Sequence, residues 1–354
     1  MAYTTIDDPS AHFQIALYTG NGGSNTITND GNSDLQADWI WLKERDSTSS
    51  NHVFDSTRGV GDNGKALLPD SNTIEGDDTA FRSFDSDGFT LANTGGFNEN
   101  TVTNVAWQWK ANGGTTSSDS NGDQTSTVQA NTTAGFSIAT FAASSSAGQT
   151  VGHGLGSAPD MYIWKSRARE DNWYVYHKSA GAGGYLRLNT TDAFTSNTNV
   201  WSNTNPSSTL IYYGGNSLST NNENHVLYSF KSIQGYSKFG AYKGNGESSG
   251  AFSYTGFKPA WIMIKRKDSS TNSDWAIYDN KRSNIGNGDN ENNDFLRAND
   301  NAVEASASGL DILSNGFKIR STSSRVNAND SLYIYMALAE HPLVSSEGVP
   351  VTAK

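Results

Sequence analysis

One pattern of apolar and polar positions occurs three times along the 354-residue chain. In each copy, a polar stretch leads into a short run of aromatic and branched residues that ends in lysine. A second aromatic run follows after a polar turn. The three first runs are Trp39–Lys43, Met161–Lys165 and Trp261–Lys265. Copies spaced about 100 to 120 residues apart indicate repeated domains rather than a solenoid of small units.

The first of these runs is apolar on both of its faces. Successive side chains of a strand point to opposite sides, so Trp39, Trp41 and Lys43 share one face and Ile40 and Leu42 share the other. A strand of this kind is covered on both sides. We therefore expect one face to meet the repeat's own core and the other to meet a neighbouring repeat or subunit.

Later strands recur with the same spacing, and no helical period longer than two turns is present. Val105–Lys110 corresponds to Val226–Lys231, and Asp87–Leu91 corresponds to Asn315–Ile319. We predict an all-β fold of three tandem antiparallel β-sandwich repeats, similar to jelly rolls. The expected segments are an N-terminal arm with repeat 1 at 1–110, a linker rich in Gly, Ser and Thr at 111–133, repeat 2 at 134–232, repeat 3 at 233–341 and a C-terminal tail at 342–354.

The composition and net charge exclude several classes of function. Charged residues make up 17% of the chain, below the about 25% of an ordinary domain, and the net charge is −11. An acidic chain is a poor match for phosphate backbones, so we predict no nucleic-acid binding. The absence of cysteine excludes disulfides and thiolate metal sites. The longest apolar run, Leu332–Ala339, is far short of a membrane span, and Met1–Ser10 lacks the features of a signal peptide.

The lysines that end the three runs allow two interpretations. Lys43, Lys165 and Lys265 could form a repeated contact to an anion or a sugar. Alternatively, they are structural, with the long stem of each cation lying over tryptophan rings. The structural interpretation is favoured, because a feature present in all copies most simply serves the shared fold. For the same reason Trp39 and Trp261 are predicted to be core residues.

Aromatic residues outside the repeated pattern are the candidates for ligand binding. Aromatic rings stack on the faces of sugar rings, and the abundant Asn, Ser and Thr can hydrogen-bond sugar hydroxyls. Trp201, Tyr212 and Tyr213 lie in segments that resemble loops. They are therefore the predicted contacts to a glycan.

Calcium is the one cofactor for which the sequence offers candidate binding loops. Asp119–Asp123 carries the alternating oxygen ligands of a calcium loop but lacks the terminal glutamate of an EF-hand, and Asn287–Asp294 is similar. Such runs are more often solvated turns. No other metal site is predicted.

No catalytic motif is present. The six histidines are dispersed, and only His177 lies on a repeated strand, where the other copies carry Asp55 and Asp279. The chain contains no metal-spaced histidine pair and no P-loop. We predict that the protein is not an enzyme.

Several sequence segments, occurring in order, resemble a family of virion proteins of marine bacteriophages that are often labelled tail-fibre-like. The segments are Ala2–Ser10, Leu17–Gly22, Val151–Pro159, Gly235–Gly240 and Tyr242–Gly246. The resemblance extends from Met1 to about Pro342 and carries no catalytic motif. The second repeat departs from it, since Ala142–Ser146 stands where the other copies have Thr-Gly-Asn-Gly.

The resemblance implies a virion structural protein, part of a tail fibre or appendage, assembled in the host cytoplasm and exposed on the particle. The expected partners are further copies of the chain, other virion proteins, and a host-surface glycan or receptor. Two alternatives stay open. One is a capsid decoration or head-fibre protein without a receptor role, and the other is a polysaccharide depolymerase.

Overall fold

The computed structural model describes residues 2–59, 64–92, 95–214, 218, 222–282 and 291–351. Nearly all of the regular structure in these residues is β-strand, and every pairing between named strands there is antiparallel. The helical elements named within them are two single turns, η1 (Pro9–Ala11) and α2 (Ser324–Asn327). The predicted all-β antiparallel class is confirmed.

The same order of four strands occurs in three sheets. We name the parts that carry them lobe 1 (residues 12–110), lobe 2 (111–231) and lobe 3 (232–342). In lobe 1 the order is β1 (Phe13–Thr19), β9 (Thr103–Trp109), β3 (Trp39–Glu44) and β4 (His52–Asp55). In lobe 2 it is β12 (Phe136–Ala143), β19 (Glu223–Phe230), β14 (Met161–Ser166) and β15 (Tyr174–His177). In lobe 3 it is β20 (Ser237–Lys243), β27 (Leu332–Pro342), β22 (Phe257–Arg266) and β23 (Ala276–Asp279).

Shorter strands extend or cover these sheets. Lobe 1 adds β2 (Asn25–Ile27), β5 (Gly64–Ala66), β6 (Gly76–Asp78), β7 (Phe81–Asp85) and β8 (Gly88–Leu91). Lobe 2 adds β10 (Ser117–Asp119), β11 (Ser126–Asn131), β13 (Gln149–Gly152), β16 (Gly184–Arg187), β17 (Thr195–Ser196) and β18 (Leu210–Tyr213). Lobe 3 adds β21 (Phe252–Tyr254), β24 (Glu291–Arg297), β25 (Ala305–Leu313) and β26 (Gly316–Ile319).

The predicted linker at 111–133 is wrong, because it contains two strands of lobe 2. β11 pairs along its whole length with β12, and β10 pairs with β11. Val128 and Gln129 are buried on opposite sides of β11. A strand rich in Ser and Thr needs few apolar side chains when its backbone hydrogen bonds extend an existing sheet. Its polar composition therefore does not distinguish it from a linker.

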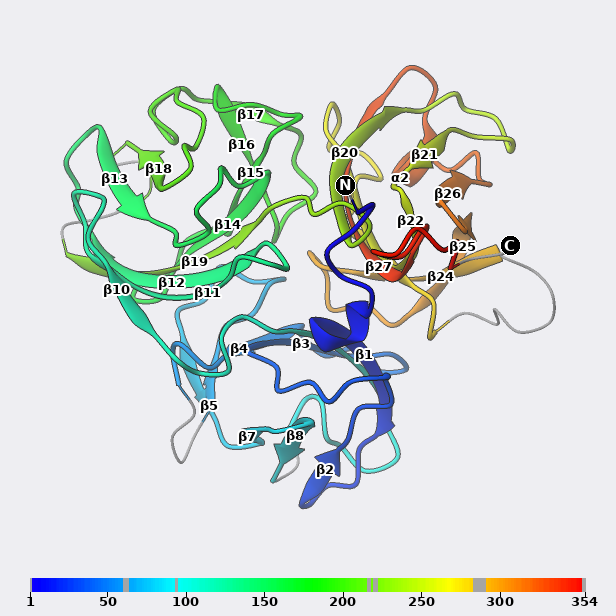
Figure 1. The fold of residues 1–354 in the computed structure, drawn as a ribbon, viewed down its shortest axis with the longest axis horizontal. Coiled ribbons are helices and arrows are strands. Elements are labelled where there is room, and N and C mark those ends of the chain that lie inside the picture. The colour runs from blue at the N-terminus through cyan, green and yellow to red at the C-terminus, as the bar shows by residue number, and fades with distance from the viewer. Residues whose placement is uncertain are drawn as a thin grey trace.

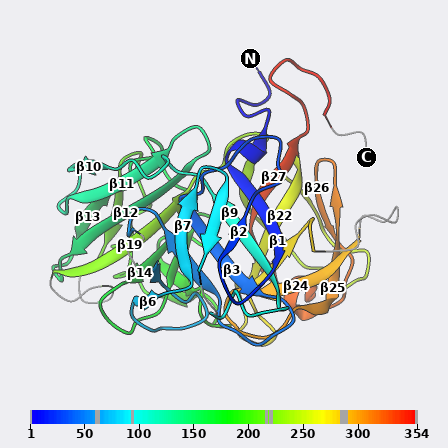
Figure 2. The ribbon, with the colours of Figure 1, turned by 90° about the horizontal axis from the view of Figure 1, so that it is seen from below.

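The three lobes form a ring rather than a row (Figure 1). The labelled strands of lobe 3 lie beside those of lobe 1 as well as those of lobe 2 (Figure 1), and the described parts of both terminal segments project on the same side of the ring (Figure 2). The ring is therefore closed between the last lobe and the first.

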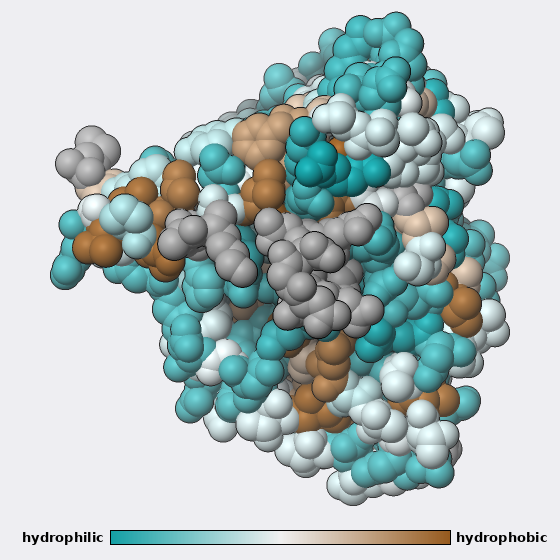
Figure 3. Space-filling model, turned by 90° about the vertical axis from the view of Figure 1, so that its right-hand side faces the viewer, coloured by the Kyte–Doolittle hydropathy of each residue, from teal (hydrophilic) through white to brown (hydrophobic). Residues whose placement is uncertain are grey.

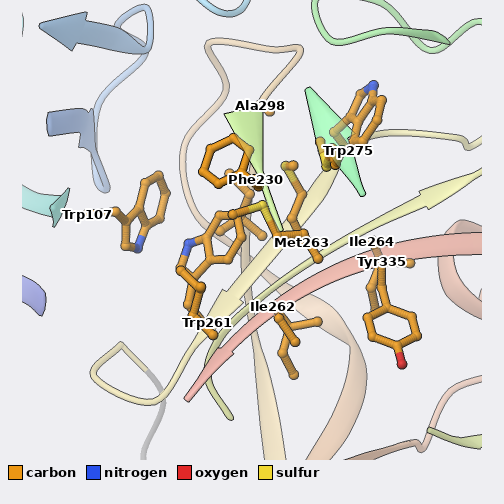
Figure 4. Packing of buried hydrophobic residues seen from close by; sticks show 14 of the residues in the cluster. Trp107, Phe230, Trp261, Ile262, Met263, Ile264, Trp275, Ala298 and Tyr335 are labelled. Carbon is orange, nitrogen blue, oxygen red and sulfur yellow. The ribbon is translucent and has the colours of Figure 1, made fainter. Parts of the chain in front are cut away.

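A shared core fills the centre of the ring. Trp107 of lobe 1, Phe230 of lobe 2 and Trp261 of lobe 3 belong to one cluster of buried residues (Figure 4). The ring centroids of Trp107 and Trp261 are 6.3 Å apart, and Trp39 stacks on Tyr228 at 4.7 Å. The lobes are therefore joined by their largest side chains.

The two faces of β3 belong to different cores, as their pattern predicts. Trp39 and Trp41 belong to the shared core, whereas Ile40 and Leu42 belong to a separate cluster inside lobe 1. The cover on the tryptophan face comes from the other lobes of the same chain. A second subunit is not needed to explain this apolar face.

Both terminal segments are attached to lobe 3. The Tyr3 hydroxyl donates to the Gly256 carbonyl at 2.7 Å, and the Ser346 N–H donates to the Asp7 carboxylate at 2.7 Å. The predicted arm and tail are thus hydrogen-bonded to the ring and to each other.

Candidate functional site

The three repeated lysines lie at the boundaries between lobes. None has any exposed surface, and each ammonium group donates to a backbone carbonyl of the neighbouring lobe. The contacts are Lys43 to Asn301 at 3.3 Å, Lys165 to Asn72 at 3.3 Å and Lys265 to Thr191 at 3.1 Å. Lobe 1 therefore contacts lobe 3, lobe 2 contacts lobe 1, and lobe 3 contacts lobe 2 through the same position.

A backbone hydrogen bond two residues further along repeats the same cycle. The donors and acceptors are Glu304 N–H to Arg45 carbonyl at 2.7 Å, Glu75 N–H to Arg167 carbonyl at 3.0 Å and Phe194 N–H to Lys267 carbonyl at 2.8 Å. Side chains reinforce each contact. Arg45 pairs with Glu304 and Arg167 with Glu75, while the Lys267 ammonium lies over the Phe194 ring at 5.1 Å.

Burial changes the acidity of these lysines. Removal from water disfavours the charged form and lowers the pKa of Lys43 and of Lys165 to about 8, and that of Lys265 to about 7. Because the three side chains are enclosed, they present nothing to an external anion or sugar. Their positions agree with the structural interpretation.

A third position also joins the lobes, but it varies in chemistry. The indole Nε1 of Trp173 donates to the Leu68 carbonyl of lobe 1 at 2.9 Å. The indole Nε1 of Trp275 donates to the Arg187 carbonyl of lobe 2 at 2.8 Å. At the corresponding place lobe 1 has Asn51, which the sequence analysis did not single out.

The fourth shared position is acidic in two lobes and a histidine in the third. The Asp55 carboxylate accepts from the Tyr228 hydroxyl at 2.6 Å, and that of Asp279 accepts from the Trp107 indole at 2.9 Å. His177 contacts the Tyr335 carbonyl through Nε2 at 3.2 Å, and burial lowers its pKa to about 4. All three contacts cross between lobes, so this position also joins them.

Two of the three aromatic residues predicted to bind a glycan are buried. Trp201 and Tyr213 have no exposed surface and belong to the core of lobe 2. The centroid of the Trp201 ring lies 4.8 Å from that of Tyr162, edge to face. The segment that resembled an exposed loop covers one face of the lobe 2 sheet, so neither ring has a free face. Tyr212, on β18, is half-buried.

The candidate calcium loop is held by its own hydrogen bonds. The Asp119 carboxylate accepts from the Asn121 N–H at 2.9 Å, and the Asp123 carboxylate accepts from the Thr150 N–H at 3.0 Å. Among the described residues no three His, Cys, Asp or Glu side chains are grouped to hold a metal ion. The first half of the other candidate, Asn287–Asp294, lies outside the described residues, which resume at 291.

One cluster in lobe 2 combines serine, histidine and a carboxylate. The Trp164 indole donates to Nδ1 of His225 at 2.9 Å, so the proton of the neutral ring is on Nε2. That nitrogen lies 3.9 Å from Glu223, whose carboxylate also accepts from the hydroxyl of Ser166. Burial lowers the pKa of His225 to about 3. The serine is paired with the acid rather than with the imidazole, which is not the order of a nucleophile and its base.

An exposed aromatic pair lies beside the chain termini, and the sequence analysis missed it. Phe252 and Tyr254 are 47% and 53% exposed on β21, two positions apart and therefore on one face. The Tyr254 hydroxyl lies 3.3 Å from that of Tyr3. Figure 3, which views the lobe 3 side, shows apolar residues in separate patches on a largely hydrophilic surface. The alternating apolar signal was present but resembled that of buried strands.

Comparison with protein families gives one match, over residues 8–342, to a family described as a domain of unknown function (DUF7483). The chain belongs to this family. The match spans all three lobes, so the DUF7483 unit is the whole ring and not one lobe. Neither curated proteins nor solved structures give a match. Among the described residues of this DUF7483 protein, no helix is long and apolar enough to cross a membrane.

Proposed function

We propose that this protein is a bacteriophage virion structural protein. It forms part of a tail fibre or related appendage, is assembled in the host cytoplasm and is exposed on the particle surface. The proposal rests on the resemblance of five sequence segments to tail-fibre-like virion proteins of marine phages. The acidic, cysteine-free and turn-rich composition also supports it.

The structural observation that carries the proposal is the use made of the buried polar groups. Lys43, Lys165 and Lys265 hydrogen-bond the backbone of a neighbouring lobe, and none is directed to a ligand. Asp55 and Asp279 do the same with side chains of other lobes. These buried polar side chains, which an enzyme could direct at a substrate, here join the three lobes to one another. A ring held together in this way is suited to exposure outside a cell without disulfides.

Attachment to the particle is proposed for the side that carries both termini. Residues 1–10 and 342–354 are equal candidates for the anchor by sequence, and the structure brings the described parts of both to lobe 3. The exposed Phe252 and Tyr254 lie there as well. Other virion proteins are therefore the expected partners on this side. Further copies of the chain and a host-surface glycan or receptor complete the proposed set of partners.

Immunogold labelling of intact particles tests this function against its alternatives. Label on the tail or its appendages supports the proposal, and label over the head supports a capsid decoration or head-fibre protein. Absence of label from purified particles contradicts both. A separate assay for reducing ends released from host envelope tests the depolymerase alternative, and we expect no release.

A further inference from the structure

The strand that precedes the lysine-ended strand lies at the edge of its sheet in each lobe. It is β2 in lobe 1, β13 in lobe 2 and β21 in lobe 3. β21 pairs with β26 on one side, and no strand of the described residues pairs with it on the other. An unpaired edge presents backbone groups that can bond a strand of another molecule. The three lobes differ in what they place at this edge.

The unpaired side of β21 carries the backbone groups of Phe252 and Tyr254. The Thr255 N–H donates to the Asn315 carbonyl at 2.9 Å, so Thr255 faces β26. Bonded residues alternate along an antiparallel pair, so Ser253 also faces β26 while Phe252 and Tyr254 face away from it. The outward N–H and C=O groups of these two residues have no hydrogen-bond partner within the described part of the chain.

The free edge ends at Gly256. The Gly256 carbonyl accepts the Tyr3 hydroxyl at 2.7 Å and the Leu343 N–H at 3.4 Å. The two terminal segments therefore occupy the edge beyond Tyr254. An edge this short offers a place for one added strand of a few residues.

Lobe 1 shows that the fold accepts polar residues at these positions. β2 pairs with β8 in the register in which β21 pairs with β26, so Phe252 corresponds to Thr26. Two positions further on, Tyr254 corresponds to Thr28. Both threonines are exposed. Lobe 3 therefore carries two half-exposed aromatic side chains where threonine is sufficient for folding.

Lobe 2 covers the corresponding edge with its own chain. The Asp123 carboxylate accepts the Thr150 N–H of β13 at 3.0 Å, and the Gln124 N–H donates to the Thr150 carbonyl at 3.1 Å. These outward groups are satisfied without a second molecule. β21 instead combines unpaired backbone groups with exposed aromatic side chains.

β21 is complementary to itself. In an antiparallel pair centred on Ser253 and related by a two-fold axis, Phe252 of one copy lies opposite Tyr254 of the other. Because both residues face outward, each opposed pair exchanges both of its backbone hydrogen bonds. The two rings then lie side by side on one face, and aromatic pairs of this kind stabilise antiparallel sheets.

The charges next to β21 are compatible with this pairing. β21 itself, Phe-Ser-Tyr, carries none. Across β26, Lys318 lies opposite Phe252 and Gly316 lies opposite Tyr254. The two copies of Lys318 are therefore separated by both copies of β21. Beside Tyr254 the glycine leaves the ring free of a neighbouring side chain.

We infer that β21 is a docking edge for a second copy of this chain, with Phe252 of one copy beside Tyr254 of the other. The inference rests on the proposed function and deepens it, because it gives the expected contact between copies a location. The same edge is used by both copies, so the pairing yields dimers rather than open filaments. The terminal segments beside the edge stay available to other virion proteins.

Sedimentation velocity on the full chain, over a range of concentrations, tests the inference. We expect a reversible equilibrium between monomer and dimer. Phe252→Thr with Tyr254→Thr gives β21 the residues of lobe 1 and should weaken dimerisation at least about tenfold, since aromatic residues dominate the energy of small interfaces. Leu332→Thr, which removes a similarly exposed apolar side chain from β27, should dimerise like the unmodified chain. A chain that stays monomeric, or a dimer that the double variant leaves unchanged, overturns the inference.

Disulfide cross-linking tests the register, because the chain contains no cysteine of its own. The Cα atoms of opposed residues in a bonded antiparallel pair lie about 5.5 Å apart, within reach of a disulfide. A mixture of Phe252→Cys chains and Tyr254→Cys chains should form linked dimers under oxidising conditions, and each chain alone should form far fewer. No linkage in the mixture, or equal linkage by either chain alone, contradicts the register.

Failure of this inference is distinguishable from failure of the proposed function. A chain that dimerises through β21 but is absent from purified particles removes the proposed function alone. A chain that is monomeric and present in particles removes this inference alone. If the double threonine variant of such a monomer is also lost from particles, the edge belongs to a contact with another virion protein.

Discussion

The indole Nε1 of Trp41 donates to the side-chain oxygen of Asn51 at 2.8 Å in the shared core. The amide nitrogen of Asn51 then donates to the Arg297 and Asp300 carbonyls of lobe 3, both at 3.1 Å. In lobe 2 the same two positions carry Ile163 and Trp173. The tryptophan is thus at the first position in lobe 1 and at the second in lobe 2. In both lobes the residue at the second position donates a hydrogen bond to the neighbouring lobe.

This exchange predicts a rescue. Asn51→Leu leaves the Trp41 indole and carbonyls of lobe 3 without partners, so the free energy of unfolding should fall by about 2 to 4 kcal/mol. The double variant Trp41→Ile with Asn51→Trp reproduces the lobe 2 arrangement and should recover most of that loss. Urea denaturation measures both. A double variant less stable than the sum of its single changes would show that the positions are not equivalent.

The buried lysines predict a rise in stability with pH. In the folded chain the pKa of Lys265 is lowered from 10.5 to about 7, so the unfolded chain binds more protons between those values. Stability should therefore increase from about pH 7 towards pH 10, by on the order of 1 kcal/mol per pH unit for each such lysine. Above that range stability should fall as pH rises, because burial raises the pKa of tyrosines such as Tyr335 in the folded chain.

Lys265→Met tests the origin of this slope. The variant removes one titrating group and should flatten the dependence measured by denaturation at pH 7, 8 and 9. Lys243→Met, at an exposed lysine that pairs with Asp330, controls for the loss of a surface charge. An unchanged slope in Lys265→Met would contradict the assignment.

Buried Glu44 predicts a fall in stability with rising pH, the opposite of the effect of the buried lysines. It is 1% exposed, and burial raises the pKa of its carboxyl from 4.5 to about 7. Ionisation at higher pH therefore costs folding energy, and stability from this group falls as pH rises from about 4.5 to 7. Glu44→Gln should stabilise the protein by about 1 to 2 kcal/mol at pH 8 and change little at pH 4. Equal effects at both pH values would exclude a titration origin.

The exposed aromatic pair predicts a loss of attachment without a loss of folding. Phe252→Thr with Tyr254→Thr changes two half-exposed side chains on a surface strand, so stability should change by no more than about 1 kcal/mol. Incorporation into particles, measured by mass spectrometry of purified virions, should fall severalfold. Normal incorporation would remove these residues from the proposed anchoring surface.

Much of the fold could be predicted from local patterns. The lysine-ended runs identify β3, β14 and β22, because alternation and β-rich composition are local signals. The two apolar faces of Trp39–Lys43 also indicated cover on both sides. The closure of lobe 3 on lobe 1 could not be predicted, because contacts such as Lys43 with Asn301 depend on chain arrangement and not on spacing.

The candidate site was less accessible to sequence reasoning. Trp201 looked exposed because polar residues surround it in the sequence, yet its ring packs edge to face on that of Tyr162 and is fully buried.

The central claim is that this chain is a structural part of a bacteriophage particle, and cryo-electron microscopy of the intact particle tests it most directly. We expect density for a three-lobed ring at the tail or an appendage, attached through the side that carries both termini. Density lying flat on the capsid lattice would contradict the appendage assignment. A particle without such a ring would contradict the virion function itself.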